Sequence, residues 1–160
     1  MADDGPIIEH PNRDKGASKA ARAAVVLLLV VSIVLILIVA IGGSDALDGA
    51  NPVAFVFALI YAVLAFYVLR WNRGVLPVIA ALAVLLAIFS GVAAPEWFAR
   101  DKTGYNDPAI ASSALGLVCV IIVPVQALLV AFAMRGFAQK WNVEVERVPE
   151  SRRRTAPFPA

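Results

Sequence analysis

The sequence of 160 residues holds one cysteine and one histidine, and these two counts exclude several kinds of site. Cys119 has no second cysteine with which to form an intrachain disulfide or a CxxC redox motif. His10 alone cannot supply the three or four converging donors of a metal site, so we expect it to be solvated. The chain therefore lacks the paired cysteines of membrane thiol oxidoreductases and the intrahelical histidines of membrane di-haem cytochromes.

Asp, Glu, Lys, Arg and His are missing from four long apolar runs, residues 23–41, 52–69, 75–94 and 109–134. Proton-coupled carriers and ion pumps normally need such a side chain within the membrane, because a buried ionisable group couples transport to protons or ions. This absence argues against both classes. Elsewhere Asp101 and Asp107, both in a loop, are the only conceivable catalytic acids. We therefore assign no catalytic, cofactor-binding or metal-ligating residue.

Apolar residues, in contrast, are abundant. They make up 61% of the chain and charged residues 16%, whereas about 25% of the residues of a soluble domain are charged. About 20 apolar residues in a helix cross the hydrocarbon core of a bilayer. The sequence therefore predicts an all-α integral membrane protein, a four-helix transmembrane bundle with short loops and helices at about 23–41, 52–70, 75–94 and 108–135. We expect the polar tail 1–22 to be disordered and residues 135–160 to form a basic tail.

Twelve of the fourteen Lys and Arg residues lie in the two tails and in the turn at 70–74, and the other two are in the loop after the third run. Because loops rich in Lys and Arg stay cytoplasmic, both termini and this turn are predicted to be cytoplasmic. The first run is longer than the apolar region of a signal peptide, so we interpret it as an uncleaved anchor. The excess of Arg over Lys is typical of a bacterium with a GC-rich genome, which would place the chain in the plasma (bacterial inner) membrane.

Small residues recur at helical spacing in the last three runs and predict their packing faces. The first run has small residues only near its ends, so we expect that helix to lie at the periphery. The turn at 70–74 should tie the second and third runs into a hairpin, and the second, third and fourth helices should pack through these faces. The predicted packing faces are Ala54, Ala58, Ala62 and Ala65 in the second run, Ala80, Ala83, Ala87, Gly91 and Ala94 in the third, and Ser112, Gly116, Cys119, Val123 and Gln126 in the fourth.

Proline and amide residues give further local predictions. The pairs Asn51-Pro52 and Asp107-Pro108 read as an N-cap followed by proline at the first helical position, so they should open the second and fourth helices. Pro124 should kink the fourth helix. Gln126 should face protein, because an unpaired amide in hydrocarbon costs a few kcal/mol.

The segments outside the runs carry weaker signals. The loop 95–108 contains Glu96, Asp101 and Asp107 without the spacing of a calcium loop, so we expect it to be solvated or interfacial. Residues 143–148 have partly the spacing of a strand, but no partner strand is evident. The basic tail with its three consecutive arginines, 152–154, is interpreted either as a determinant of orientation or as a segment that attracts anionic lipid.

Two functions stay open, together with a third that has less support. The leading hypothesis is a non-enzymatic accessory, assembly or structural partner of a larger membrane complex, in contact with lipid and with other membrane proteins or further copies of itself through small-residue helix faces. The alternative is a small uncharged-solute transporter or an oligomeric channel, with Ser112, Cys119 and Gln126 along a polar path. The third is an enzyme acting at the membrane surface. Nothing in the sequence indicates nucleic-acid binding.

Overall fold

A computed structural model of the chain describes residues 7–46, 51–100 and 108–147. Four long helices dominate it: α2 (Gly16–Gly42), α3 (Asn51–Leu69), α4 (Leu76–Ala99) and α5 (Ser112–Ala138). Each is long and apolar enough to span a membrane, so the prediction of an all-helical chain with four such helices is confirmed. Shorter elements are α1 (Pro11–Asp14) and the 3-10 turns η1 (Ser44–Ala46) and η2 (Arg73–Val75). Two short strands, β1 (Ile7–Glu9) and β2 (Val145–Arg147), complete the described part of the chain.

The first long helix begins earlier than the apolar run. It starts at Gly16, because Ala, Lys and Arg between residues 17 and 22 are good helix formers and because Ser18 and Ala21 continue the buried face of α2 toward the N-terminus. The tail that the sequence predicts to be disordered is therefore structured from Ile7 onward, and that prediction was wrong for residues 7–22.

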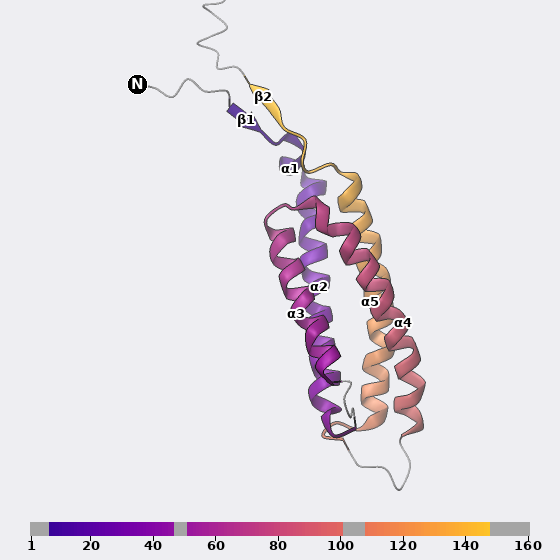
Figure 1. Ribbon diagram of the computed structural model, residues 1–160. Coiled ribbons are helices and arrows are strands. Elements are labelled where there is room, and N and C mark those ends of the chain that lie inside the picture. The colour runs from indigo at the N-terminus through magenta and orange to yellow at the C-terminus, as the bar shows by residue number, and fades with distance from the viewer. Residues whose placement is uncertain (1–6, 47–50, 101–107, 148–160) are drawn as a thin grey trace, which may run out of the picture.

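The two strands give a second correction. Ile7 pairs with Arg147, Ile8 with Glu146 and Glu9 with Val145 in an antiparallel ribbon. The strand-like spacing after residue 143 therefore does have a partner, supplied by the opposite end of the chain. Figure 1 shows the ribbon projecting from the end of the bundle where α2 begins and α5 ends. We call this end the termini end, and the opposite end, which carries Gly43 and Trp97, the loop end.

At the loop end, α4 and α5 also differ from their predicted bounds. Pro95 lies inside α4, which continues to Ala99 and thereby buries Trp97, so residues 95–99 are helix and not loop. Helix α5 begins at Ser112 and not at Pro108, because the segment before it crosses the end of α2, where the Ile110 amide donates to the Gly42 carbonyl at 3.1 Å. Asp107 lies outside the described residues.

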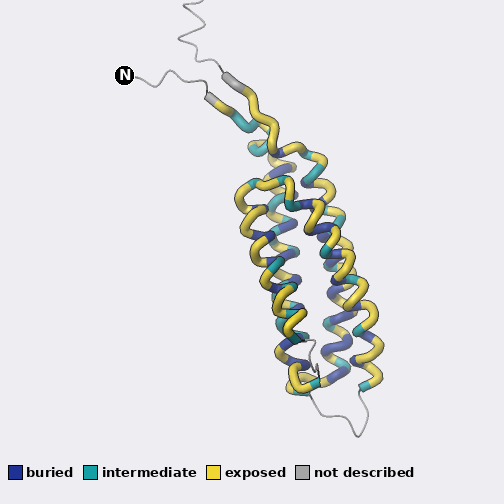
Figure 2. The backbone as a smooth tube through the Cα atoms, in the orientation of Figure 1, coloured by how far each residue is buried: buried dark blue, intermediate teal, exposed yellow. Residues whose placement is uncertain are grey.

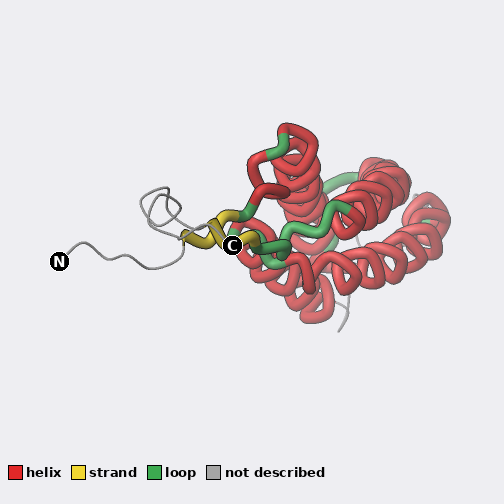
Figure 3. Tube along the Cα trace, turned by 90° about the horizontal axis from the view of Figure 1, so that it is seen from above, coloured by secondary structure: helices red, strands yellow, loops and turns green. Residues whose placement is uncertain are grey.

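Helix α2 occupies a central place in the bundle. It contacts both α3 and α5, while α4 makes the most extensive contact of all with α5 and scarcely touches α3. The helices are therefore in contact in the order α3, α2, α5, α4. Figure 1 labels them in a side view, and Figure 3 shows the same bundle from above. The predicted peripheral position of the first helix was wrong. The predicted packing among the second, third and fourth helices is right for α4 with α5 but wrong for α3, which packs on α2. Buried residues of α2 recur at steps of three and four, namely Ser18, Ala21, Val25, Leu29, Ser32, Ile36 and Ala40.

Contacts at the termini end explain why α3 and α4 diverge. In the turn, Trp71 has a φ of 61° and its ring packs edge to face against Trp141, with ring centroids 5.4 Å apart. Arg73 Nε donates to the Phe137 carbonyl of α5 at 2.6 Å. Both contacts hold the start of α4 beside the end of α5. The chain therefore leaves the turn along α5 and does not fold back along α3.

The predicted small-residue faces are partly right. Ala58 and Ala65 of α3 and Ala80, Ala83 and Ala94 of α4 are buried, as are four of the five residues named on α5. The exceptions are Ala54 and Ala87, which are half-buried, and Ala62, Gly91 and Val123, which are exposed. On α5 the buried position is Ile122, one residue before Val123. Figure 2 shows the buried residues on the inward faces of the four long helices, and the outward faces carry exposed apolar side chains such as Leu27, Leu59 and Val92.

Candidate functional site

Three polar side chains from three helices meet inside the bundle. Tyr61 of α3 donates from its hydroxyl to Gln126 Oε1 of α5 at 3.0 Å, and Gln126 Nε2 donates to Ser32 Oγ of α2 at 2.9 Å. The Ser32 hydroxyl in turn donates to the Leu28 carbonyl at 2.7 Å. All three side chains are fully buried. We call them the Ser32–Tyr61–Gln126 cluster.

The cluster satisfies groups that would otherwise be costly. An amide buried in apolar surroundings without partners costs a few kcal/mol, and here its oxygen and its nitrogen are both bonded. The prediction that Gln126 faces protein is confirmed. Its partners were not predicted, although Ser32 is the one polar residue of the first apolar run and Tyr61 lies at helical spacing from Ala58 and Ala65 of the predicted face of the second. Those two signals could have suggested the pairing.

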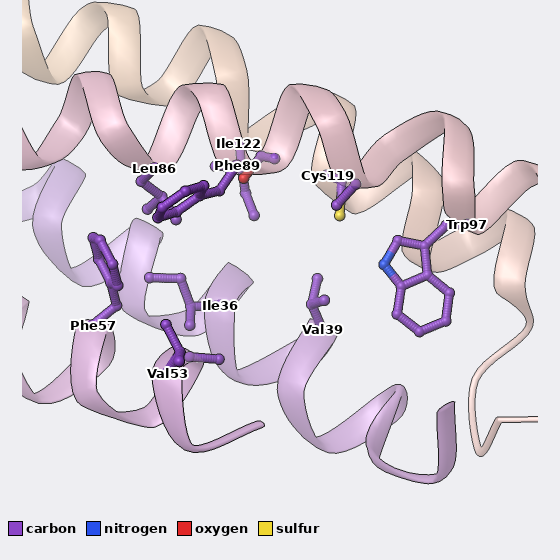
Figure 4. Close-up of a pocket in the computed structure, with 12 residues that line it drawn as sticks. Ile36, Val39, Val53, Phe57, Leu86, Phe89, Trp97, Cys119 and Ile122 are labelled. Atoms are coloured by element: carbon purple, nitrogen blue, oxygen red, sulfur yellow. The ribbon is translucent and has the colours of Figure 1, made fainter. Parts of the chain in front are cut away.

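Directly beside the cluster, toward the loop end, lies an apolar cavity of about 310 Å³. Three of its lining residues lie one helical turn from a member of the cluster. Ile36 comes four residues after Ser32 on α2, Phe57 four residues before Tyr61 on α3, and Ile122 four residues before Gln126 on α5. All four long helices contribute to the lining, as Figure 4 shows. The further lining residues are Val39, Val53, Ala54, Leu86, Phe89, Ser90, Ala93, Trp97 and Cys119.

The cavity exists because α3 and α4 diverge. The Phe57 and Phe89 rings bridge the space between these helices edge to face, with centroids 6.1 Å apart. Val53 of α3 and Phe89 of α4 are 55% and 52% exposed, so they form the mouth of the cavity on the outer surface. The mouth therefore opens sideways, on a face that would meet the hydrocarbon of a bilayer.

The chemistry of the lining is that of an apolar binding surface. Ser90 and Cys119 bring a hydroxyl and a thiol into an otherwise hydrocarbon and aromatic wall. Among the described residues, no group of three or more His, Cys, Asp and Glu side chains is placed to hold a metal ion. The cavity can therefore bind apolar groups, and its lining offers no pair of side chains suited to acid–base or nucleophilic chemistry.

The residues named for a polar path are separated in the structure. Cys119 lines the cavity, Gln126 belongs to the hydrogen-bonded cluster, and Ser112 is buried near the loop end without lining the cavity. On the termini side of the cluster the core is filled by fully buried Leu29, Ile79 and Leu129. Within the described residues, the three polar positions therefore do not line one continuous channel.

Only some of the charged residues predicted in the second loop are among the described residues. Glu96 is exposed on α4, while Asp101 and Asp107 lie outside the described residues. Trp97, predicted to be interfacial, is buried against Gly43 and lines the cavity. Phe98 is half exposed beside Gly116, and Tyr105 lies outside the described residues.

Comparison with known proteins returned no relative: no family model, no curated protein and no solved structure matches the chain.

Proposed function

We propose that this chain is a non-enzymatic, multi-pass protein of the bacterial inner membrane, with both termini cytoplasmic, and that it works as a partner subunit in a larger membrane complex. The membrane location is supported by four apolar helices whose outward faces are covered with exposed hydrophobic residues. The orientation is supported by the basic residues of the termini end.

The observation that carries the proposal is the cavity between α3 and α4. An apolar cavity of about 150 Å³ binds one benzene molecule, so a cavity of about 310 Å³ has room for roughly two aromatic rings. A bundle closed on itself would fill such a space with its own side chains. This cavity is apolar and open at the lateral surface of the bundle, so it is instead suited to the side chains of a partner helix.

The partner contact proposed here differs from the one suggested by the small-residue stripes. Ala58, Ala65, Ala80 and Ala83 are used inside the bundle, where they bring its own helices together. The mouth at Val53 and Phe89 opens into space that the bundle's own side chains do not fill, and it is therefore the surface proposed for a second protein.

A solute carrier or oligomeric channel has less support. Both hydrogen-bonding ends of Gln126 are occupied by Tyr61 and Ser32, so the amide is not free to bind a solute in this structure. The termini half of the core is filled by apolar side chains.

Site-specific photo-crosslinking in native membranes tests the proposal. A photoreactive residue at Phe89, in the cavity mouth, is expected to form a crosslink to a distinct membrane protein. The matched control is Leu117, a 55% exposed residue of α5 that does not line the cavity, and it should give little or none of that product. A chain that is crosslinked to lipid alone at both positions, and is purified in mild detergent as a lone monomer, would refute a partner role.

A further inference from the structure

A second apolar hollow runs along the outside of α2 near the termini end. It has a volume of about 430 Å³ and is lined by Ala23, Val26, Leu27 and Val30 of α2 and by Leu69 of α3, with Lys19 and Arg22 also in its wall. These α2 residues follow one another at helical spacing, so the hollow is a groove along the helix axis. Its apolar walls would lie against hydrocarbon in a membrane.

A polar hollow of about 690 Å³ adjoins this groove at the termini end. Lys19 and Arg22 line both, so the two hollows meet at these side chains. The remaining wall of the polar hollow comes from Ile8, Glu9, His10, Arg13, Asp14 and Trp71. The polar hollow and the apolar groove are thus continuous at Lys19 and Arg22.

The basic side chains are held in different ways. The Arg22 guanidinium lies over the Trp71 ring, 4.5 Å from its centroid. This contact holds the cation through its flat face, whereas its N–H groups donate in the plane of the guanidinium itself. Lys19 Nζ is 3.7 Å from Asp14 Oδ1, but the two side chains are 59% and 84% exposed, so this ion pair is weak. Arg13 is bonded through Nε to the Trp141 carbonyl at 3.1 Å.

The charges in the polar hollow favour an anion. Among the described residues that line it, Arg13, Lys19 and Arg22 outnumber the carboxylates of Glu9 and Asp14. The two cations nearest the groove, Lys19 and Arg22, stand where a helix that spans a bilayer reaches the level of the lipid headgroups. Arginine is suited to phosphate because its planar N–H groups can bond two oxygens at once.

We propose that this place binds one anionic phospholipid. Its phosphate lies between Lys19 and Arg22, and one acyl chain occupies the groove along Ala23, Val26 and Val30. A free phosphate would leave the groove empty, and a zwitterionic lipid would bring no net negative charge to Lys19 and Arg22. The site is separate from the cavity between α3 and α4, because the two share no lining residue.

The test is lipid binding by the full chain in mild detergent, measured by native mass spectrometry with phosphatidylglycerol and phosphatidylcholine as probes. Each basic residue near an anionic surface contributes an attraction that corresponds to about fivefold in affinity. Lys19→Gln with Arg22→Gln is therefore expected to weaken phosphatidylglycerol binding by about 25-fold and to change phosphatidylcholine binding much less, because the choline group offsets the charge of that phosphate. The control is Arg70→Gln with Arg135→Gln, which removes the same charge from exposed residues outside the site and should change binding less than threefold.

Two further measurements separate the proposal from its rivals. Lys19→Arg with Arg22→Lys keeps both charges and should retain most of the binding. Ala23→Trp, which fills the groove, should weaken phosphatidylglycerol binding although no charge changes. Equal losses in the test and control pairs would indicate diffuse attraction and overturn a defined site. Displacement of the lipid by millimolar inorganic phosphate, or equal wild-type affinity for the two lipids, would overturn it as well.

Discussion

Replacement of Gln126 by Leu is the sharpest test of how this bundle is held together. The substitution keeps the volume of the side chain but removes both hydrogen bonds of the amide, those to Tyr61 and Ser32. Hydrogen bonds between membrane helices contribute about 0.6 kcal/mol each on average. The larger effect comes from the Tyr61 hydroxyl, which stays buried without a partner at a cost of about 1 to 3 kcal/mol. We therefore expect Gln126→Leu to lower the free energy of unfolding by about 2 kcal/mol.

The same reasoning predicts that removing the whole cluster is less harmful than removing its centre. In the triple variant Ser32→Ala, Tyr61→Phe, Gln126→Leu no buried polar side chain is left unpaired at this place. Replacing both partners of a buried hydrogen bond by apolar groups of similar shape is nearly neutral. The triple variant should therefore unfold within about 1 kcal/mol of the wild type, and so recover most of the stability that the single substitution loses.

Unfolding by SDS in mixed micelles, followed by helical circular dichroism and tryptophan fluorescence, measures these differences. Tyr67→Phe is the matched control for Tyr61→Phe, because Tyr67 is 45% exposed and its substitution should change stability by less than about 0.5 kcal/mol. A triple variant less stable than Gln126→Leu would refute the reasoning, because it would mean that the three residues contribute independently.

Three further predictions concern other parts of the bundle. Trp141→Ala, which empties a fully buried site at the termini end, should lower the free energy of unfolding by about 3 to 5 kcal/mol, measured by the same SDS titration. Gly43→Ala should cost about 1 to 3 kcal/mol, because the added Cβ would stand 2.6 Å from the Trp97 ring, whereas Gly91→Ala in α4, with open space around its Cβ, should stabilise by about 0.5 to 1 kcal/mol. In liposomes, Cys119 should resist a charged methanethiosulfonate reagent, because it lines an apolar cavity, and mass spectrometry measures the extent of labelling.

Each of these has its control. Met134→Ala on α5 removes a 48% exposed side chain and should have a small effect, so an equal loss in Met134→Ala and Trp141→Ala would contradict the packing at the termini end. For the labelling, a cysteine placed at exposed Ser44 should react rapidly. Labelling of Cys119 at a comparable rate would indicate water in the cavity and would favour the transporter or channel.

The sequence predicts the four helices well because length and apolarity are local properties. The contacts between the helices could not be predicted in this way, because hydrophobicity does not distinguish the buried face of such a helix from the face exposed to lipid. On α2, Val25 is buried and Leu27 is 64% exposed, although both are aliphatic. The prediction that α2 is peripheral rested on its few small residues, yet α2 is buried through large aliphatic side chains, those of Val25, Leu29 and Ile36.

The candidate site, too, could be predicted from the sequence only in part. The cost of burying an amide was enough to predict that Gln126 faces protein. Its partners, and the cavity next to them, depend on how far α3 diverges from α4, which is decided by contacts of Trp71 and Arg73 with residues more than sixty positions away in the chain. The β1–β2 ribbon joins residues still further apart, so neither strand could be paired from its own sequence.

The contact order α3, α2, α5, α4 has a consequence for biogenesis. Of the four helices, α5 is the last that the ribosome releases, yet it is the neighbour of both α2 and α4. Until α5 enters the bilayer, α4 has almost no helix surface to pack on. The hydroxyls of Ser32 and Tyr61 also lack the Gln126 amide that connects them. Helices α2 and α3 can pack on each other before α5 is made, whereas the packing of α4 and the completion of the Ser32–Tyr61–Gln126 cluster must follow the insertion of α5.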